Sequence, residues 1–370
     1  MFRLLIRPLL RILSFEQGHR LVVWLLRIVG WIPGGRWLLG RCCAVEDPSL
    51  EREVFGVRFR NPIGAAAGID RNGEIFNELG AIGFGFVEVG TLTPNGQSGN
   101  PTPRVFCSES ERTIRHRSGH PNRGLKSAIR HLRRTHHNVV VGCNLACNAS
   151  TPSYDAPKDV LKLFRNLYQY VDYFTVNISG DDVQNETLTH SDDYVRALLD
   201  PLFDFRRGQN QYRPILLKIS PDVDDATIDR ISDILIATPL DGIVATNGSF
   251  RATVSGSPRK AGRVSGADLA ARSTEVVRRI RERVGKAYPI IGSGGMLTPT
   301  DVQAMFEAGA DLVQLCSGFI FEGSKFVKEV CLSLIPAAQP ETPAVEPQPA
   351  EAEGVETSAS ATNQSDSATE

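Results

Sequence analysis

Short apolar runs alternate with amphipathic stretches from about residue 60 onward. Most runs are rich in Val, Ile or Phe, and most end in Gly or a polar residue. They are residues 61–68, 84–91, 139–145, 173–179, 215–220, 242–247, 288–295 and 312–318. Helical patterns, such as residues 274–284 and 299–310, lie between most of them. This alternation is typical of a parallel sheet, and eight repeats predict a closed (β/α)8 TIM barrel over residues 46–335. A doubly wound open α/β sheet is the alternative.

The first 45 residues predict a short amphipathic helical extension. Large apolar residues alternate with Arg at helical spacing, and Trp24, Trp31 and Trp37 are interspersed. Pro8 and the turn at residues 32–35 divide the segment, so no apolar run approaches the ~20 residues that span a bilayer. Arg together with Trp on such a segment favours peripheral membrane association through residues 1–41. A targeting presequence and a helical cap on the main domain are the alternatives.

Residues 336–370 predict a disordered acidic tail. They are rich in Pro, Ala, Glu, Ser and Thr and have almost no large apolar residue, so they cannot offset the entropy of ordering. Residues 338–370 carry seven acidic residues and no Lys or Arg. The seven cysteines show no disulfide-like layout, which favours a reducing compartment. Cys143 and Cys147 lack a second pair, so we expect no metal site.

Several predicted strands end in residues that suit a flavin nucleotide. The glycines of residues 292–295 and 316–318 follow the seventh and eighth strands, where TIM barrels commonly bind phosphate. Lys218 ends the fifth strand, and a Lys on a barrel strand needs a negative partner such as a reduced flavin.

The motifs FEQGHR, NPIGAAAGID, GFVEVGTLTP, GNPTPRVF, GCNLACN, TVNIS, LLKISPD, IVATN, PIIGSGGM and LVQLCSGFIFEG occur in this order along the chain. In these motifs the chain from about residue 1 to 335 resembles the quinone-linked (class 2) dihydroorotate dehydrogenases. That resemblance implies an FMN-dependent TIM barrel with a membrane-associating helical extension. The implied FMN contacts are Ala67, Gly68, Thr91, Asn144, Asn177, Lys218, Thr246, Gly266, Gly295, Cys316 and Ser317.

The substrate positions depart from the family pattern. The implied substrate contacts are Arg71, His116, Asn177, Asp182 and Asn247. Two of the four asparagines that the family places around orotate remain, and His116 and Asp182 stand at the other two positions. Arg71 stands where the family has Lys. Cys107 stands where the family has an Arg near the quinone tunnel.

The position of the family's catalytic serine is Gly180, which has no side chain to accept a proton. Asp182 and His116 are candidate replacements. Ser179 is adjacent, but neighbouring strand residues face opposite sides. A carboxylate at residue 182 would repel an anionic ligand, and a cationic His116 would partly offset that charge.

By resemblance, the chain oxidises dihydroorotate to orotate with quinone as acceptor, in pyrimidine (UMP) biosynthesis. The resemblance also implies a peripheral location on the cytoplasmic face of a bacterial inner membrane, or on the mitochondrial inner membrane. The alternatives are an FMN oxidoreductase with another substrate and a flavin-binding protein without catalysis. Arg71, His116 and Asp182 clustered around one cavity would favour an enzyme, whereas a filled or collapsed cavity would favour the last alternative. The mixed charge of the helices favours no nucleic-acid binding.

Overall fold

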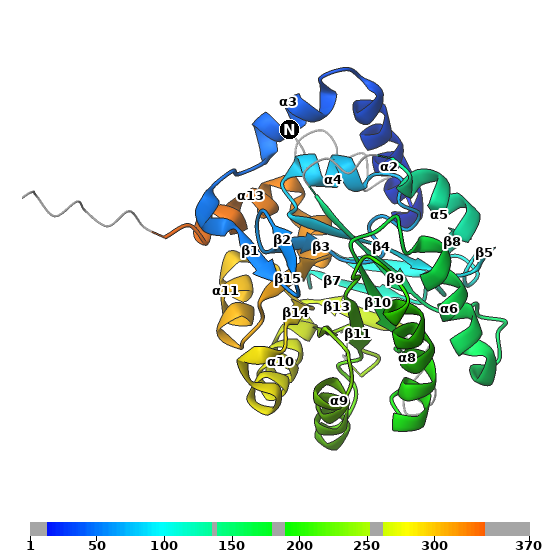
Figure 1. Ribbon diagram of the computed structural model, residues 1–370. Helices are drawn as coiled ribbons and strands as arrows, with labels where there is room; N and C mark the ends of the chain where they lie inside the picture. The colour runs from blue at the N-terminus through cyan, green and yellow to red at the C-terminus, as the bar shows by residue number, and fades with distance from the viewer. Residues whose placement is uncertain (1–12, 135–138, 180–188, 252–261, 337–370) are drawn as a thin grey trace, which may run out of the picture. The chain divides into compact units, whose positions relative to one another are not determined.

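The computed structural model describes residues 13–134, 139–179, 189–251 and 262–336. Within these residues eight parallel strands close into a barrel in the order β10-β11-β12-β14-β15-β3-β4-β9 (Figure 1). The strands are β3 (Ile63–Ala65), β4 (Phe86–Leu92), β9 (Val140–Leu145), β10 (Tyr173–Asn177), β11 (Ile215–Ile219), β12 (Gly242–Ala245), β14 (Ile290–Ser293) and β15 (Leu312–Leu315). Each lies within one of the eight apolar runs, except that β4 ends one residue later at Leu92, so the predicted TIM barrel is confirmed and the open sheet is wrong.

Helices follow every barrel strand and cover the outside of the barrel. They are α4 (Phe76–Ile82), α5 (Leu125–Leu132), α6 (Ala156–Leu167), α8 (Asp192–Arg207), α9 (Asp225–Ala237), α10 (Ala270–Val284), α11 (Pro299–Glu307), α12 (Ser317–Glu322) and α13 (Ser324–Ser333). Short 3-10 turns are η2 (Pro48–Leu50), η3 (Ser153–Asp155), η4 (Ala267–Leu269) and η5 (Gly285–Ala287). In α10, Val276, Val277, Ile280 and Val284 are buried, which is the apolar stripe that its sequence predicts.

Aromatic side chains fill the amino end of the barrel. The hairpin of β1 (Arg52–Val54) and β2 (Val57–Phe59) brings Phe59 to within 5.3 Å of Phe86, measured between ring centroids. Phe86 and Tyr173 occupy the space above Gly64 and Gly142, where an added Cβ would lie within 2.2 and 2.1 Å of those rings. Because this end is filled, ligands reach the strands from their carboxyl ends.

Two excursions of the chain cover the carboxyl end of the barrel. The first, between β4 and α5, contains β5 (Asn95–Gln97), β6 (Val105–Ser108), β7 (Thr113–His116) and β8 (Asn122–Gly124). The second contains β13 (Arg263–Gly266), which pairs antiparallel with β7. In this register Arg263 lies opposite His116, so two distant parts of the chain meet above the strand ends.

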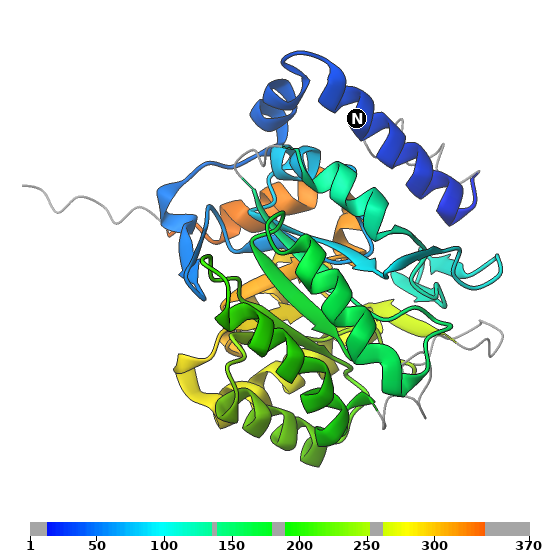
Figure 2. The same ribbon diagram turned by 45° about the vertical axis from the view of Figure 1, so that its right-hand side comes forward.

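The N-terminal extension forms two helices, α2 (Phe15–Trp31) and α3 (Gly35–Cys43). Ser14 and Gln17 form a capping box at the start of α2, and the predicted turn at residues 32–35 separates the helices. Both helices pack on α4, and α2 also contacts β6 (Figure 2). Among the described residues no single helix is long and apolar enough to cross a membrane, although α2 and α3, bent by 115°, pass that test together.

Candidate active site

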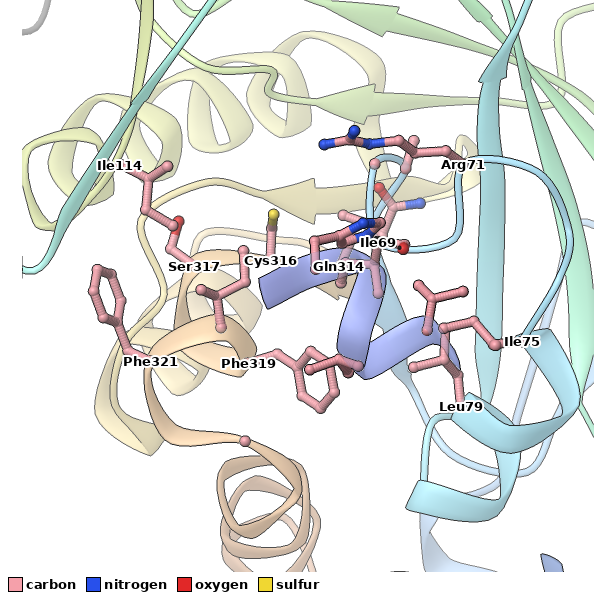
Figure 3. Close-up of a pocket in the computed structure, with 18 of the residues that line it drawn as sticks. Ile69, Arg71, Ile75, Leu79, Ile114, Gln314, Cys316, Ser317, Phe319 and Phe321 are labelled. Atoms are coloured by element: carbon pink, nitrogen blue, oxygen red, sulfur yellow. Dashed lines mark hydrogen bonds between the residues drawn. The ribbon is translucent and has the colours of Figure 1, made fainter. Parts of the chain in front are cut away.

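A cavity of about 1550 Å³ opens at the carboxyl ends of the barrel strands. Its lining comes from the strand ends, from β6, β7 and β13, and from the inward faces of α2, α3 and α12. Figure 3 shows Arg71 and Gln314 toward the strands, with Leu79, Phe319 and Phe321 on the opposite side. The cavity therefore joins a polar end at the barrel to an apolar end at the helices.

Almost all the residues predicted to contact a flavin line this cavity. They are Ala67, Gly68, Thr91, Asn144, Asn177, Lys218, Thr246, Gly295, Cys316 and Ser317. Gly266 does not line it, although its neighbour Ser265 does. A Cβ on Gly266 would lie 2.2 Å from the carbonyl oxygen of Arg112, and its φ is +110°, so this glycine allows β13 and β7 to approach closely.

The glycines of the polar end fit a bound flavin nucleotide. Gly68 has a φ of +104°, and a Cβ there would enter open space with no protein atom within 4 Å. Gly295 packs so closely on α10 that a Cβ would lie 2.2 Å from the amide nitrogen of Ala270. Thr91 Oγ1 donates a hydrogen bond of 2.7 Å to Asn144 Oδ1, which orients the amide. Gly68 therefore leaves backbone surface open to a ligand, as a phosphate or a flat ring requires, whereas Gly295 allows the strand end to approach α10.

Lys218 is only 5% exposed and stands in a network that the sequence did not reveal. Its Nζ lies 3.4 Å from Gln314 Oε1, and Gln314 Nε2 donates to Glu88 Oε2 at 2.7 Å. Glu88 is fully buried and also accepts a hydrogen bond of 2.8 Å from Asn144 Nδ2. A charged residue inside the apolar run of residues 84–91 was the only signal that could have identified Glu88. This network holds Lys218 and Asn144 from beneath the cavity.

On the substrate side, Arg71, His116 and Asn247 line the same cavity, whereas Gly180 and Asp182 lie outside the described residues. The cavity is open, so the filled site that would have favoured a protein without catalysis is not found. Ser179 does not line it. Its Oγ is buried and has no hydrogen-bond partner among the described residues, which argues against Ser179 as a substitute proton acceptor.

Arg71 projects from a loop that is fixed by buried hydrogen bonds. The Asp70 carboxylate accepts hydrogen bonds of 2.8 Å from the backbone N–H groups of Glu74 and Ile75. Burial raises the pKa of Asp70 to about 6, although these hydrogen bonds oppose the shift. Arg71 itself forms no salt bridge with a described residue, and burial lowers its pKa. A guanidinium in this position is available to a carboxylate of a ligand.

Burial and the neighbouring cations favour the neutral form of His116 over the cation that the sequence suggested. Burial lowers its pKa to about 4, and the charges of Arg263, His120 and Arg71 act in the same direction. A neutral imidazole can donate one hydrogen bond and accept another. His116 can therefore replace the hydrogen bonds of an asparagine amide, but it cannot offset a negative charge.

The first turn of the helix α2 is attached to the walls of the cavity. Glu16 forms a salt bridge of 2.5 Å with Arg104, and both side chains are largely buried. His19 Nε2 lies 2.9 Å from the carbonyl oxygen of Ile69, two residues before Arg71. Burial lowers the pKa of His19 to about 4, so this ring is neutral and donates to the carbonyl.

Apolar side chains line the outer end of the cavity. They are Val22, Val23, Leu25, Leu26, Val29, Ile32, Leu38, Leu39, Phe319, Ile320 and Phe321. Cys107 also lines the cavity and is exposed. This end suits a lipid-soluble molecule that enters between α2 and α3.

Comparisons with known proteins identify the family of the chain. The family model described as dihydroorotate dehydrogenase matches residues 49–337. A protein of Christiangramia forsetii named dihydroorotate dehydrogenase (quinone) is 39% identical over 332 residues, covering 89% of this chain and 97% of that protein. The chain belongs to the dihydroorotate dehydrogenase family. A second quinone-type relative, from Alkalilimnicola ehrlichii, is 37% identical and covers 90% of this chain and 98% of its own length.

Solved structures of dihydroorotate dehydrogenases share the fold. A crystal structure of the Eimeria tenella protein in complex with ferulenol has a TM-score of 0.77 at 28% identity. The match covers 85% of this chain and 89% of the Eimeria tenella chain. This likeness agrees with the TIM barrel of the chain and with its place in the dihydroorotate dehydrogenase family.

Proposed function

We propose that the chain is an FMN-dependent dihydroorotate dehydrogenase that oxidises dihydroorotate to orotate and passes the electrons to a membrane quinone, in pyrimidine biosynthesis. The observation that carries the proposal is that one continuous cavity has a polar end at the barrel strands and an apolar end at α2 and α3. Its three proposed parts are the helical extension (1–45), the barrel (46–335) and the acidic tail (336–370). The quinone-type relatives support the acceptor.

Lys218, Asn144, Thr91, Gly68 and Gly295 would hold the FMN. When bound, FMN supplies a two-electron acceptor that can pass electrons on singly to a quinone. Lys218 places a cation in a buried position, where it stabilises negative charge strongly. The apolar outer end excludes water and accepts the quinone.

The substrate would lie between Arg71 and the amide of Asn247. Arg71 binds its carboxylate as a forked donor, and Asn177, Asn247 and neutral His116 form hydrogen bonds with its ring. Gly180 leaves the family's serine position without a proton acceptor, which makes this chain a divergent member. An FMN oxidoreductase with a different anionic substrate is the second candidate, favoured by the imidazole at His116 and the larger cation at Arg71.

Anaerobic reduction of the bound flavin tests this proposal. We expect the purified protein to show flavin absorbance that bleaches when dihydroorotate is added and returns when a quinone is added. Bound flavin that stays oxidised with dihydroorotate, but bleaches with another anionic substrate, would favour the second candidate. A protein purified without any flavin would contradict both.

We further propose that α2 and α3 bind peripherally to the membrane, which for the bacterial relatives corresponds to the cytoplasmic face of the inner membrane. Trp24, Trp31 and Trp37 are 57%, 73% and 69% exposed, unlike core aromatic residues. Exposed aromatic rings on Arg-bearing helices are typical of membrane-interface helices.

Replacing these three tryptophans by serine is expected to reduce binding to phosphatidylglycerol-containing vesicles at least about tenfold, because each ring contributes roughly 1.5 kcal/mol or more of apolar burial. Cosedimentation with the vesicles measures the effect. Tyr154→Ser is the control, because Tyr154 is 81% exposed and lies on η3, away from α2 and α3. Equal binding of the triple variant and the wild type would contradict the membrane assignment.

A further inference from the structure

His120 lies in the segment between β7 and β8 and lines the cavity together with Asn177, Lys218 and Asn247. Its side chain is half-buried. His120 has no role in the motifs that identify the family, and nothing described so far assigns one to it. The charge of His120 acts on His116, so its imidazole lies near one of the groups that would bind the substrate.

The backbone that carries His120 is fixed at four successive carbonyl groups. Asn100 Nδ2 and Asn100 N donate to the carbonyl oxygens of Arg117 and Ser118, at 2.8 and 3.1 Å. The side chain of Gln97 donates to the next carbonyl, that of Gly119, at 2.9 Å. The side chain of Asn122 then donates to the carbonyl of His120, also at 2.9 Å. Such a set of side-chain amides holds an irregular segment in one conformation.

His120 also has an unusual backbone conformation, with a φ of +46°. A left-handed conformation is unfavourable for a residue with a Cβ and persists only where the surroundings enforce it. Such residues cluster at functional sites because the strain aims a side chain that a relaxed backbone would direct elsewhere. The hydrogen bonds along residues 117–120 supply the enforcement here.

The other cavity residues that could accept a proton are poorly suited to the task. His116 is a weak base, since its pKa is about 4. The Cys316 thiol remains protonated because burial raises its pKa. Glu322 is held in a salt bridge with Arg112, and Glu109 is exposed. Compared with these four groups, His120 is therefore the better-placed acceptor.

We propose that His120 is the catalytic base that takes the C5 proton of dihydroorotate in place of the serine missing at Gly180. The proposal rests on the proposed function. The C5–H bond breaks and its proton binds an imidazole nitrogen. The electron pair left on C5 forms the C5=C6 double bond, while hydrogen leaves C6 as hydride to the flavin oxidant.

The first test compares His120→Gln with His116→Asn in the flavin-loaded protein. His120→Gln is expected to lower kcat by about 10²–10⁴-fold, because it removes a positioned base. In the wild type, kcat is expected to fall tenfold per pH unit below the pKa of the imidazole, since only the neutral ring accepts a proton. This dependence of kcat on pH is expected to disappear in His120→Gln. His116→Asn is expected to change KM and to retain the pH dependence of kcat. A His120→Gln enzyme within about threefold of the wild-type kcat would overturn the proposal.

The second test does not depend on turnover or on the folding of a variant. The imidazole signals of the wild-type holoprotein, labelled with ¹³C-histidine, are titrated by NMR with and without orotate. The His120 signal is assigned in the wild type by through-bond correlation of the ring with the backbone of residues 119 and 120. We expect orotate to shift the apparent pKa of His120 measurably, because the ligand lies against the ring. A His120 titration unchanged by bound orotate would overturn the proposal, whereas flavin that dihydroorotate cannot bleach would overturn the proposed function instead.

Discussion

Replacing Lys218 by Met is expected to lower the rate of flavin reduction by dihydroorotate by about 10²–10³-fold, because it removes a buried cation from the site where negative charge develops. Lys218 is 5% exposed, and its described polar partner is the neutral Gln314, so water does not screen its charge. Stopped-flow absorbance under anaerobic conditions measures the rate. The reduction potential of the bound flavin should become more negative in the same variant.

Lys158→Met is the matched control for this prediction. Lys158 lies on α6, is fully exposed apart from its pairing with Asp155, and has no contact with the cavity. Its replacement should leave the rate within about twofold, since surface ion pairs contribute little. A Lys218→Met protein that keeps its flavin and reduces it at the wild-type rate would show that Lys218 does not face the developing charge.

Replacing Glu88 by Leu is expected to destabilise the protein by at least about 3 kcal/mol. The buried Glu88 carboxylate accepts hydrogen bonds from Asn144 Nδ2 (2.8 Å), Thr175 Oγ1 (2.9 Å), Tyr173 OH (3.3 Å) and Gln314 Nε2 (2.7 Å). Leucine would leave four buried donors without this acceptor, and each unsatisfied donor costs about 1–3 kcal/mol. The contributions of neighbouring donors are not additive, so the four costs are not summed and the loss of stability is given only as a minimum.

Urea denaturation followed by circular dichroism measures this effect as a lower midpoint. Glu307→Leu makes the same chemical change at an exposed position on α11 and should change the free energy of unfolding by no more than about 0.5 kcal/mol. A Glu88→Leu protein as stable as Glu307→Leu would show that the donors find other partners. The flavin content of Glu88→Leu should also fall, because Asn144 loses the partner that orients its amide.

The barrel could be predicted because its pattern is local. Each apolar run is bounded by glycine or polar residues, and the intervening helices show their buried stripe in the sequence. The end of the barrel that carries the site also follows from the sequence, since parallel strands place all their carboxyl ends together. Lys218 and Asn177 could thus be assigned to one site before any coordinates were known.

The protonation of the site could not be predicted in the same way. His116 looks like a potential cation in the sequence, yet Arg263 lies opposite it only because β13 pairs with β7 across a long separation in the chain. The pKa of an imidazole depends on burial and on charges brought near by packing, and neither is encoded by adjacent residues. The close approach of Gly266 to Arg112 could not be predicted for a related reason, because it depends on the pairing of β13 with β7.

The sequence by itself determined the strand and helix order, the family, and the positions at which this chain departs from it, including Gly180. Only the tertiary structure decided that one cavity joins the barrel to α2 and α3, that Glu88 organises the floor of that cavity, and that His120 is held at its polar end. The physical reason is the separation along the chain of the residues that determine each property. Hydrophobic periodicity and residue identity are local properties, whereas burial, charge and hydrogen-bond satisfaction depend on segments that meet only when the chain has folded.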